Sequence, residues 1–466
     1  MRPLVIATLV LFSGVLAAHH ASAASTHAYA VCSDFMTGSL SAVDLSTRAV
    51  SPDVASIGSD AVARWQGGLV VVVNRYGGDN IQEIDPNAGY GTVRQFSVGN
   101  GSNPQDIVYA SATKAYVSRY GSASIQIVNP TTGALLSPIS LAEFADSDGL
   151  PEMARMVRVD RWLFVACQRL TSFSPSNPSM VVVVDTQADT VLDVDSVTPG
   201  KQAITLALRN PVTSFAFDRA RSRLLIGCSG FYGANDGGIE AIDPVGLTSL
   251  GVVLPESTLN GDVGDVAVED GGHAYALVTR SASNALISWD QATGDTLHTI
   301  YQHSGGFSLP DMELNDRHEL YVCLNDFSTP GLLVFNTATD LLAAGPLATG
   351  LPPVSVTFDL ATDRVLGTPL VAPATGVELS APWPNPASGA VRLAWTLPRA
   401  GEGRADVFDV AGRHVRTLAS GVLEAGRHDL RWDLRDDGAQ RVQAGVYLVR
   451  ARSGASTLTR QLVVVP

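Results

Sequence analysis

A unit of about 45 residues recurs along the chain, and this repeat constrains the fold more than any other feature of the sequence. Its clearest copies are PQDIVYA…KAYVSRYGSASIQIVNPTTGALL, VGDVAVE…AYALVTRSASNALISWDQATGDTL and LPDMELN…LYVCLNDFSTPGLLVFNTATDLL. Apolar residues alternate within each run, as in β-strands, and turns rich in Asp, Asn and Gly separate the runs. Four strands per unit at this period are typical of a β-propeller blade, whereas a helical solenoid needs 3.6-residue periodicity.

The strand count predicts seven blades and shows how the ring closes. First strands begin near Asp60, Gln105, Glu152, Thr213, Val263, Asp311 and Val354. Sets of the other three strands begin near Ala28, Leu69, Lys114, Trp162, Leu224, Ala274 and Leu320. The N-terminal set has no first strand before it, and the strand at 354–359 has no full set after it. We therefore expect 354–359 to join the N-terminal set and leave no unpaired edge.

The repeat also resembles a known family. Pro-x-Asp-Ile/Met, Tyr-Val-x-Arg-Tyr-Gly and Ile-x-Ile-Val-Asn-Pro-x-Thr-Gly resemble the YVTN-type seven-bladed propellers of exported bacterial and archaeal proteins. The resemblance covers residues 24–367 and implies the fold. It does not imply an activity, because that superfamily contains binding proteins, surface-layer proteins and some enzymes.

Residues 1–23 predict a cleavable secretory signal. Arg2 precedes an apolar stretch from Leu4 to Ala18, and an A-x-A site ends at Ala23. The stretch is shorter than the roughly 20 residues of a membrane-spanning helix. Position 24 is alanine, so the cysteine of a lipoprotein is missing. We expect an exported protein without a membrane span, extracellular or on the cell surface, with the periplasm as the alternative.

The C-terminal region predicts a second, smaller domain. Residues 368–378 are rich in Pro, Ala and Thr, typical of a linker, and short alternating runs in 379–466 predict an immunoglobulin-like β-sandwich. The domain resembles the flagellar-hook-capping-protein (FlgD)-like immunoglobulin-like domain and the type IX secretion sorting domain at Asn385-Pro386, Phe408–Arg413, Trp432-Asp433 and Gly445-Val446-Tyr447. That resemblance implies sorting or surface attachment through a secretion or envelope component. A passive structural cap is the alternative.

The charge differs between the two domains. Residues 24–378 carry 18 Lys and Arg against 37 Asp and Glu, whereas 379–466 carry 12 against 8. The net charges are −19 and +4. An acidic surface repels phosphate groups, which excludes nucleic acid and anionic lipid as partners of the large domain.

Four cysteines lie in short apolar runs, namely Cys32, Cys167, Cys228 and Cys323. We expect buried thiols, because free cysteine is among the most buried residue types. The alternative, in an oxidising compartment, is pairing of Cys167 with Cys228 or of Cys32 with Cys323.

The loops between second and third strands are the first candidate site. They share one face with the loops that lead into the first strands, and loops on a rigid scaffold commonly carry binding residues. The predicted ligand-binding residues are Arg75, Tyr76, Arg119, Tyr120, Arg169, Phe173, Phe231, Tyr232 and Arg280. The longest such loop, 168–179, lies in the fourth blade and marks the functional side. In the alternative interpretation, each arginine pairs with a carboxylate and each tyrosine packs under a loop.

A ring of carboxylates is the second candidate site. Five acidic residues open first strands, namely Asp60, Asp106, Glu152, Asp265 and Asp311, with Ser214 and Ser355 at two equivalent places. Converging carboxylates suit calcium, which takes six to eight oxygen ligands. The alternative is that each carboxylate caps backbone amides of the adjoining blade. DSDG at 146–149 does not match a calcium loop, because Phe144 stands where the loop should start.

Common enzyme signatures are absent from the sequence, including HExxH, GxSxG and the Walker loop. We therefore expect a non-catalytic module that binds a protein or a glycan. One alternative is a metal-dependent hydrolase or lyase at the channel mouth, with Glu152, Asn325 and Asp326 as candidates. The other is a structural component of the cell envelope.

Overall fold

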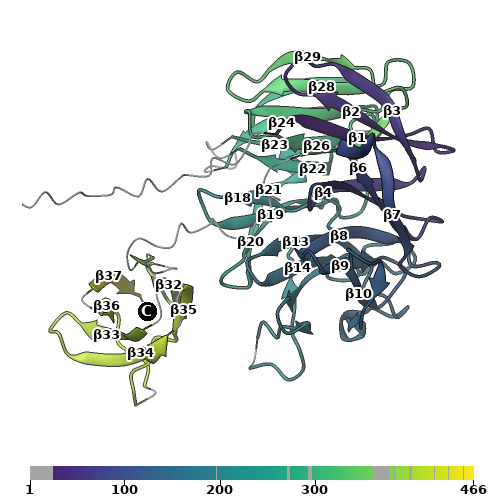
Figure 1. The fold of residues 1–466 in the computed structure, drawn as a ribbon. Coiled ribbons are helices and arrows are strands. Elements are labelled where there is room, and N and C mark those ends of the chain that lie inside the picture. The colour runs from purple at the N-terminus through teal and green to yellow at the C-terminus, as the bar shows by residue number, and fades with distance from the viewer. Residues whose placement is uncertain are drawn as a thin grey trace, which may run out of the picture.

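Antiparallel sheets of four or five strands make up most of the chain in the computed structural model (Figure 1). The structure describes residues 25–465 except 196, 270–272, 292–295, 360–377, 381, 383–384, 398–400, 424–425, 439 and 455. Seven sheets lie between His27 and Phe358 within this part of the chain, and we call them blades 1 to 7. The predicted all-β class is confirmed. The predicted signal peptide and nearly all of the predicted linker lie outside the described residues.

The bounds of the strands are as follows. Blade 1 contains β30 (Pro353–Phe358), β1 (His27–Ser33), β2 (Gly38–Asp44) and β3 (Val50–Ile57). Blade 2 contains β4 (Ala61–Gln66), β5 (Leu69–Asn74), β6 (Asn80–Asp85) and β7 (Gly91–Ser97). Blade 3 contains β8 (Pro104–Ser111), β9 (Lys114–Arg119), β10 (Ser124–Asn129), β11 (Ala134–Leu135) and β12 (Ile139–Ser140). Blade 4 contains β13 (Met153–Val159), β14 (Trp162–Cys167), β15 (Met180–Asp185), β16 (Thr190–Val191) and β17 (Ile204–Thr205).

The remaining blades follow the same order. Blade 5 contains β18 (Ala216–Asp218), β19 (Arg223–Cys228), β20 (Gly238–Asp243) and β21 (Thr248–Pro255). Blade 6 contains β22 (Asp262–Val268), β23 (His273–Thr279), β24 (Ser283–Asp290) and β25 (Thr296–Ser304). Blade 7 contains β26 (Met312–Leu314), β27 (Glu319–Leu324), β28 (Gly331–Asn336) and β29 (Leu341–Leu347). Short helices are η1 (Pro86–Ala88), η2 (Ala142–Phe144) and α1 (Glu256–Leu259).

The ring closes by pairing a late strand with the first one. β30 pairs with β1 in antiparallel register, with Ala30 opposite Val356 and Ala28 opposite Phe358. Phe358 is buried and packs edge-on against Tyr321 of blade 7, with ring centroids 5.1 Å apart. The predicted closure by 354–359 is confirmed.

The second strand of each blade is buried on both faces. In β5, Val70 to Val73 are all fully buried, because the sheet lies between two neighbouring blades. The strict alternation expected from the sequence therefore fails in these strands. The physical reason is that both faces of the sheet contact protein, so both select apolar side chains.

The C-terminal domain is a two-sheet sandwich. One sheet contains β31 (Glu378–Leu379), β32 (Val391–Leu397) and β35 (Gly426–Trp432). The other contains β34 (His414–Leu423), β33 (Gly401–Asp409), β36 (Gly445–Ser453) and β37 (Ser456–Val464). Trp395 and Trp432 lie in the core, and the Trp432 indole donates to the carbonyl of Arg435 at 2.8 Å. The predicted sandwich is confirmed.

The four cysteines are free and buried. Burial raises the pKa of Cys32 and of Cys167 to about 12, which keeps both as thiols at neutral pH. Neither of the two disulfide pairs considered from the sequence is formed in this structure. No helix among the described residues is both long and apolar enough to cross a membrane.

Candidate functional site

Three of the predicted ring carboxylates link neighbouring blades inside the channel. Asp106 accepts the backbone N–H of Met156 at 2.8 Å, Asp265 that of Met312 at 3.0 Å, and Asp311 that of Val356 at 2.8 Å. Asp106 and Asp265 lie on the first strand of a blade and Asp311 directly precedes one, and each donor lies on the first strand of the next blade. These carboxylates act as the amide caps that the sequence suggested as the alternative to a metal site.

The same geometry identifies the residues at the equivalent positions. Asp311 stands directly before Met312, just as Ser355 stands before Val356 and Arg155 before Met156. Arg155 therefore occupies the ring position that the sequence analysis assigned to Glu152. The channel carries charges of both signs at this level, not five converging carboxylates.

Asp60 and Glu152 lie outside the ring. Asp60 accepts from Nε of Arg75 at 2.8 Å, and its side chain is 39% exposed. Glu152 is buried and accepts the backbone N–H of Leu170 at 3.0 Å. The structure thus does not bring the five predicted metal ligands together, and calcium stays a prediction.

Glu152 belongs instead to a small acidic cluster in blade 4. Carboxylate oxygens of Asp146, Asp148 and Glu152 lie within 4.8 Å of one another. Asp146 accepts from the hydroxyl of Thr171 at 2.8 Å and from the amide of Asn177 at 2.7 Å. Burial, with the nearby Asp148 and Asp146 carboxylates, raises the pKa of Glu152 to about 7. Because Thr171 and Asn177 belong to the long loop 168–179, the cluster anchors that loop.

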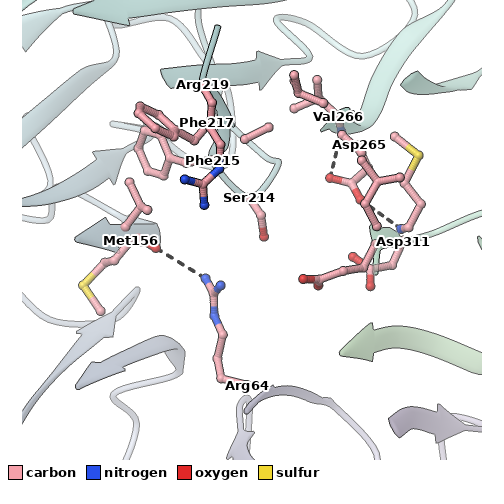
Figure 2. Close-up of a pocket in the computed structure, with 16 residues that line it drawn as sticks. Arg64, Met156, Ser214, Phe215, Phe217, Arg219, Asp265, Val266 and Asp311 are labelled. Atoms are coloured by element: carbon pink, nitrogen blue, oxygen red, sulfur yellow. Dashed lines mark hydrogen bonds between the residues drawn. The ribbon is translucent and has the colours of Figure 1, made fainter. Parts of the chain in front are cut away.

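A cavity of about 140 Å³ lies in the channel beside the ring (Figure 2). Figure 2 shows the guanidinium groups of Arg64 and Arg219 and the hydroxyl of Ser214 directed toward its middle. Asp265 and Asp311 lie on the opposite side. Arg64 is not among the residues predicted from the sequence, because nothing in its local pattern separates it from an ordinary strand residue.

Burial and neighbouring charges inside the channel shift the pKa values of these groups. Arg64 forms two bonds with Asp106, from Nε at 2.8 Å and from Nη2 at 2.5 Å. Burial lowers the pKa of Arg64, but Asp106 outweighs this effect and the net shift is upward. Burial, with the charge of Asp311, raises the pKa of Asp265 well above its usual range. Burial also raises the pKa of Asp311, to about 6.

The predicted arginines of the loop face hold the loops in place. Arg119 donates to the carbonyl of Val98 at 3.1 Å, and Arg169 to that of Pro178 at 2.9 Å. Arg280 donates to the carbonyl of Asn260 at 3.0 Å, and Arg75 pairs with Asp60. Most of these bonds go to backbone carbonyls, so the carboxylate partners of the alternative interpretation occur only at Arg75.

Aromatic side chains, by contrast, are exposed on this face. Tyr120 is half-buried, and burial raises its pKa to about 12. Seven large aromatic side chains are exposed in the part of the chain that the structure describes, and all lie in loops at this end: Phe35, Tyr76, Phe173, Phe231, Tyr232, Phe307 and Phe327. Two pairs stack between loops, Phe35 with Phe327 at 6.1 Å and Tyr232 with Phe307 at 5.6 Å. We call these seven residues the aromatic face.

Three residues of the aromatic face have a left-handed backbone. Their φ angles are +70° at Phe35, +62° at Phe173 and +61° at Phe307. This conformation costs an L-residue roughly 1–2 kcal/mol, because Cβ approaches the carbonyl oxygen. Such strain gathers at binding sites, where the surrounding structure holds it.

Comparisons with known proteins found similar proteins for both parts of the chain. Residues 384–456 match the family described as the FlgD Ig-like domain. A solved protein from Lactobacillus plantarum is 14% identical with a TM-score of 0.52, and covers 72% of this chain and 99% of its own. A functionally unknown protein from Desulfotomaculum acetoxidans is 15% identical with a TM-score of 0.50 and the same coverage. The Dos1 propeller is 8% identical with a TM-score of 0.45, covering 72% of this chain and 87% of its own. No curated protein matches the chain.

Proposed function

We propose that this protein is an exported, non-catalytic binding module whose aromatic face binds a partner protein. The observation that carries the proposal is that all seven exposed aromatic side chains among the described residues lie at one end of the propeller. Aromatic residues are enriched at the energetic centres of interfaces, and large exposed apolar patches mark interaction sites.

A protein fits this face better than a glycan. The seven rings lie on loops of several blades, from Phe35 in blade 1 to Phe327 in blade 7. A sugar ring stacks on one or two aromatic side chains, whereas a protein surface covers many loops at once. A hydrolase is less well supported, because Asp106, Asp265 and Asp311 are already bonded to backbone amides.

The ends of the chain support export and attachment. The predicted cleavage after Ala23 would release a mature chain that begins at Ala24. We propose that the mature protein is extracellular or at the cell surface, and that the immunoglobulin-like domain attaches or sorts it. The net charge of −19 in residues 24–378 favours a basic partner surface, because opposite charges steer association.

The test compares two double variants of the mature chain. Phe173→Ser with Tyr232→Ser removes two exposed rings from the aromatic face. Leu341→Ser with Leu342→Ser removes two exposed apolar side chains from β29, elsewhere on the molecule. The readout is affinity capture of surface proteins from the source cells, with a glycan array in parallel.

We expect the wild type and the β29 variant to capture the same partner protein in similar amounts. The aromatic-face variant should capture at least tenfold less of it. Equal capture by all three proteins would contradict the proposal. Array binding that requires Phe173 and Tyr232 would show that the ligand is a glycan.

A further inference from the structure

The channel cavity presents opposite charges on its two sides. Arg64 and Arg219 lie on one side, and Asp265 and Asp311 on the other (Figure 2). Glu313 also lines the cavity, and its charge acts on Arg64. Asp265 is 4% exposed, and its two oxygens accept the N–H groups of Val266 and Met312. The carboxylates are therefore fixed in position, and a ligand meets a preorganised arrangement of charge.

Arg64 retains hydrogen-bonding capacity for a ligand. Its Nε and Nη2 donate to Asp106, and Nη2 also lies 3.4 Å from the carbonyl of Met156. Within the described residues, no group accepts from its Nη1. The Ser214 hydroxyl points into the same space (Figure 2). These two groups form a donor site suited to a carboxylate.

The size of the cavity limits the ligand. A cavity of about 150 Å³ accepts a molecule the size of benzene, which has about six heavy atoms. The channel cavity, at about 140 Å³, is of this class. A small α-amino acid has this number of heavy atoms and carries both charges.

We propose that the channel cavity binds a small zwitterion of the α-amino acid class, with its carboxylate on Arg64 and Ser214 and its ammonium group beside Asp265 and Asp311. A ligand with one charge uses only one side of the cavity, because a carboxylate bonds to Nη1 of Arg64 and to the Ser214 hydroxyl, whereas an ammonium group bonds to Asp265 and Asp311. The zwitterion satisfies both sides at once. This site is separate from the aromatic face, so it extends beyond the proposed function.

Binding is coupled to proton release. Burial raises the pKa of both Asp265 and Asp311 and outweighs the opposing charges of Arg155 and Arg64, so each holds a proton at a higher pH than an ordinary aspartate. An ammonium group favours the charged form of a carboxylate and so displaces the proton. The binding enthalpy therefore depends on the ionisation enthalpy of the buffer.

The experiment is calorimetric titration of the mature protein with alanine, propionate and ethylamine. Propionate keeps only the anionic group, and ethylamine keeps only the cationic group. We expect alanine to bind at least tenfold more tightly than either analogue, with a buffer-dependent enthalpy. Absence of heat with millimolar alanine, or equal affinities for alanine and propionate, would overturn the proposal.

Two variants and a control locate the site. Ser214→Leu places a large side chain at the cavity wall and should abolish alanine binding. Asp311→Asn keeps an acceptor for Val356 and should weaken alanine and ethylamine while sparing propionate. Tyr76→Ser, on the aromatic face, should bind alanine as the wild type does. Unchanged alanine affinity in both Ser214→Leu and Asp311→Asn would also overturn the proposal.

Discussion

The buried carboxyl of Asp311 makes the stability of the propeller depend on pH. It joins blade 7 to blade 1 through the N–H of Val356, and burial raises its pKa from 3.8 to about 6. The folded state therefore binds this proton more tightly than the unfolded state. The stability that the Asp311 proton contributes is fully present below the pKa of this carboxyl in the unfolded state. It is lost as the pH rises through about 6.

We expect Asp311→Asn to remove this pH dependence, because the amide stays neutral and still accepts from Val356. Relative to the variant, the wild type should lose roughly 1–3 kcal/mol of unfolding free energy between about pH 4 and pH 7, at about 1.4 kcal/mol per pKa unit. Urea unfolding of the mature chain at both pH values measures the difference.

Asp60→Asn is the matched control. Asp60 forms a partly exposed ion pair with Arg75, and such pairs are worth under about 1 kcal/mol. Its loss should not reproduce the pH-dependent difference of Asp311→Asn. Parallel pH profiles for the wild type and Asp311→Asn would show that the Asp311 carboxyl does not titrate differently in the two states.

The channel residues show how far the sequence specifies single positions. Asp106, Asp265 and Asp311 were placed on the ring, because the sequence pattern puts each near the opening of a first strand. Glu152 was misplaced, because it takes the position that Asn103 has before Asp106: the carbonyl of each accepts a backbone N–H of the next strand, and each has a left-handed backbone. The acidic side chain of Glu152 made it look like a ring residue, whereas the ring position of this blade holds the arginine Arg155.

Strand β30 is the element on which the closed ring depends. Its pairing with β1 could be predicted by counting strands at the two ends, which needs no knowledge of side-chain contacts. The long loop 168–179 is different. Its length marked it in the sequence, but its anchorage by Asp146 depends on contacts between the loop and the segment before β13.

We expect deletion of β30 to destabilise the propeller more than deletion of the whole sandwich. Fragment 24–353 lacks Val356 and Phe358, both nearly fully buried, and exposes the edge of β1. Loss of one buried phenylalanine side chain alone costs about 3–5 kcal/mol. Thermal unfolding should place 24–353 well below 24–367, and 24–367 close to the propeller transition of the full chain. Equal melting temperatures of the two fragments would disprove the role of β30.

The whole molecule consists of two units with separate cores. The sandwich core contains only residues from Leu379 onward, and the core clusters of the blades contain none of these residues. Each unit could be predicted from the sequence, because its own repeat or motif order specifies it. The partner, by contrast, could not be predicted, because the aromatic face is assembled from loops that vary between blades.

We expect the two units to unfold independently, since domains with separate cores usually do. Trp432→Ala removes a buried ring that packs against Tyr447 and donates to Arg435, and should destabilise the sandwich by about 3–5 kcal/mol. Calorimetry of the mature chain should show one transition moved to lower temperature and the other unchanged. Phe358→Ala, in β30, should move only the transition that Trp432→Ala leaves in place. If either substitution moved both transitions together, the two cores would have to unfold as one cooperative unit.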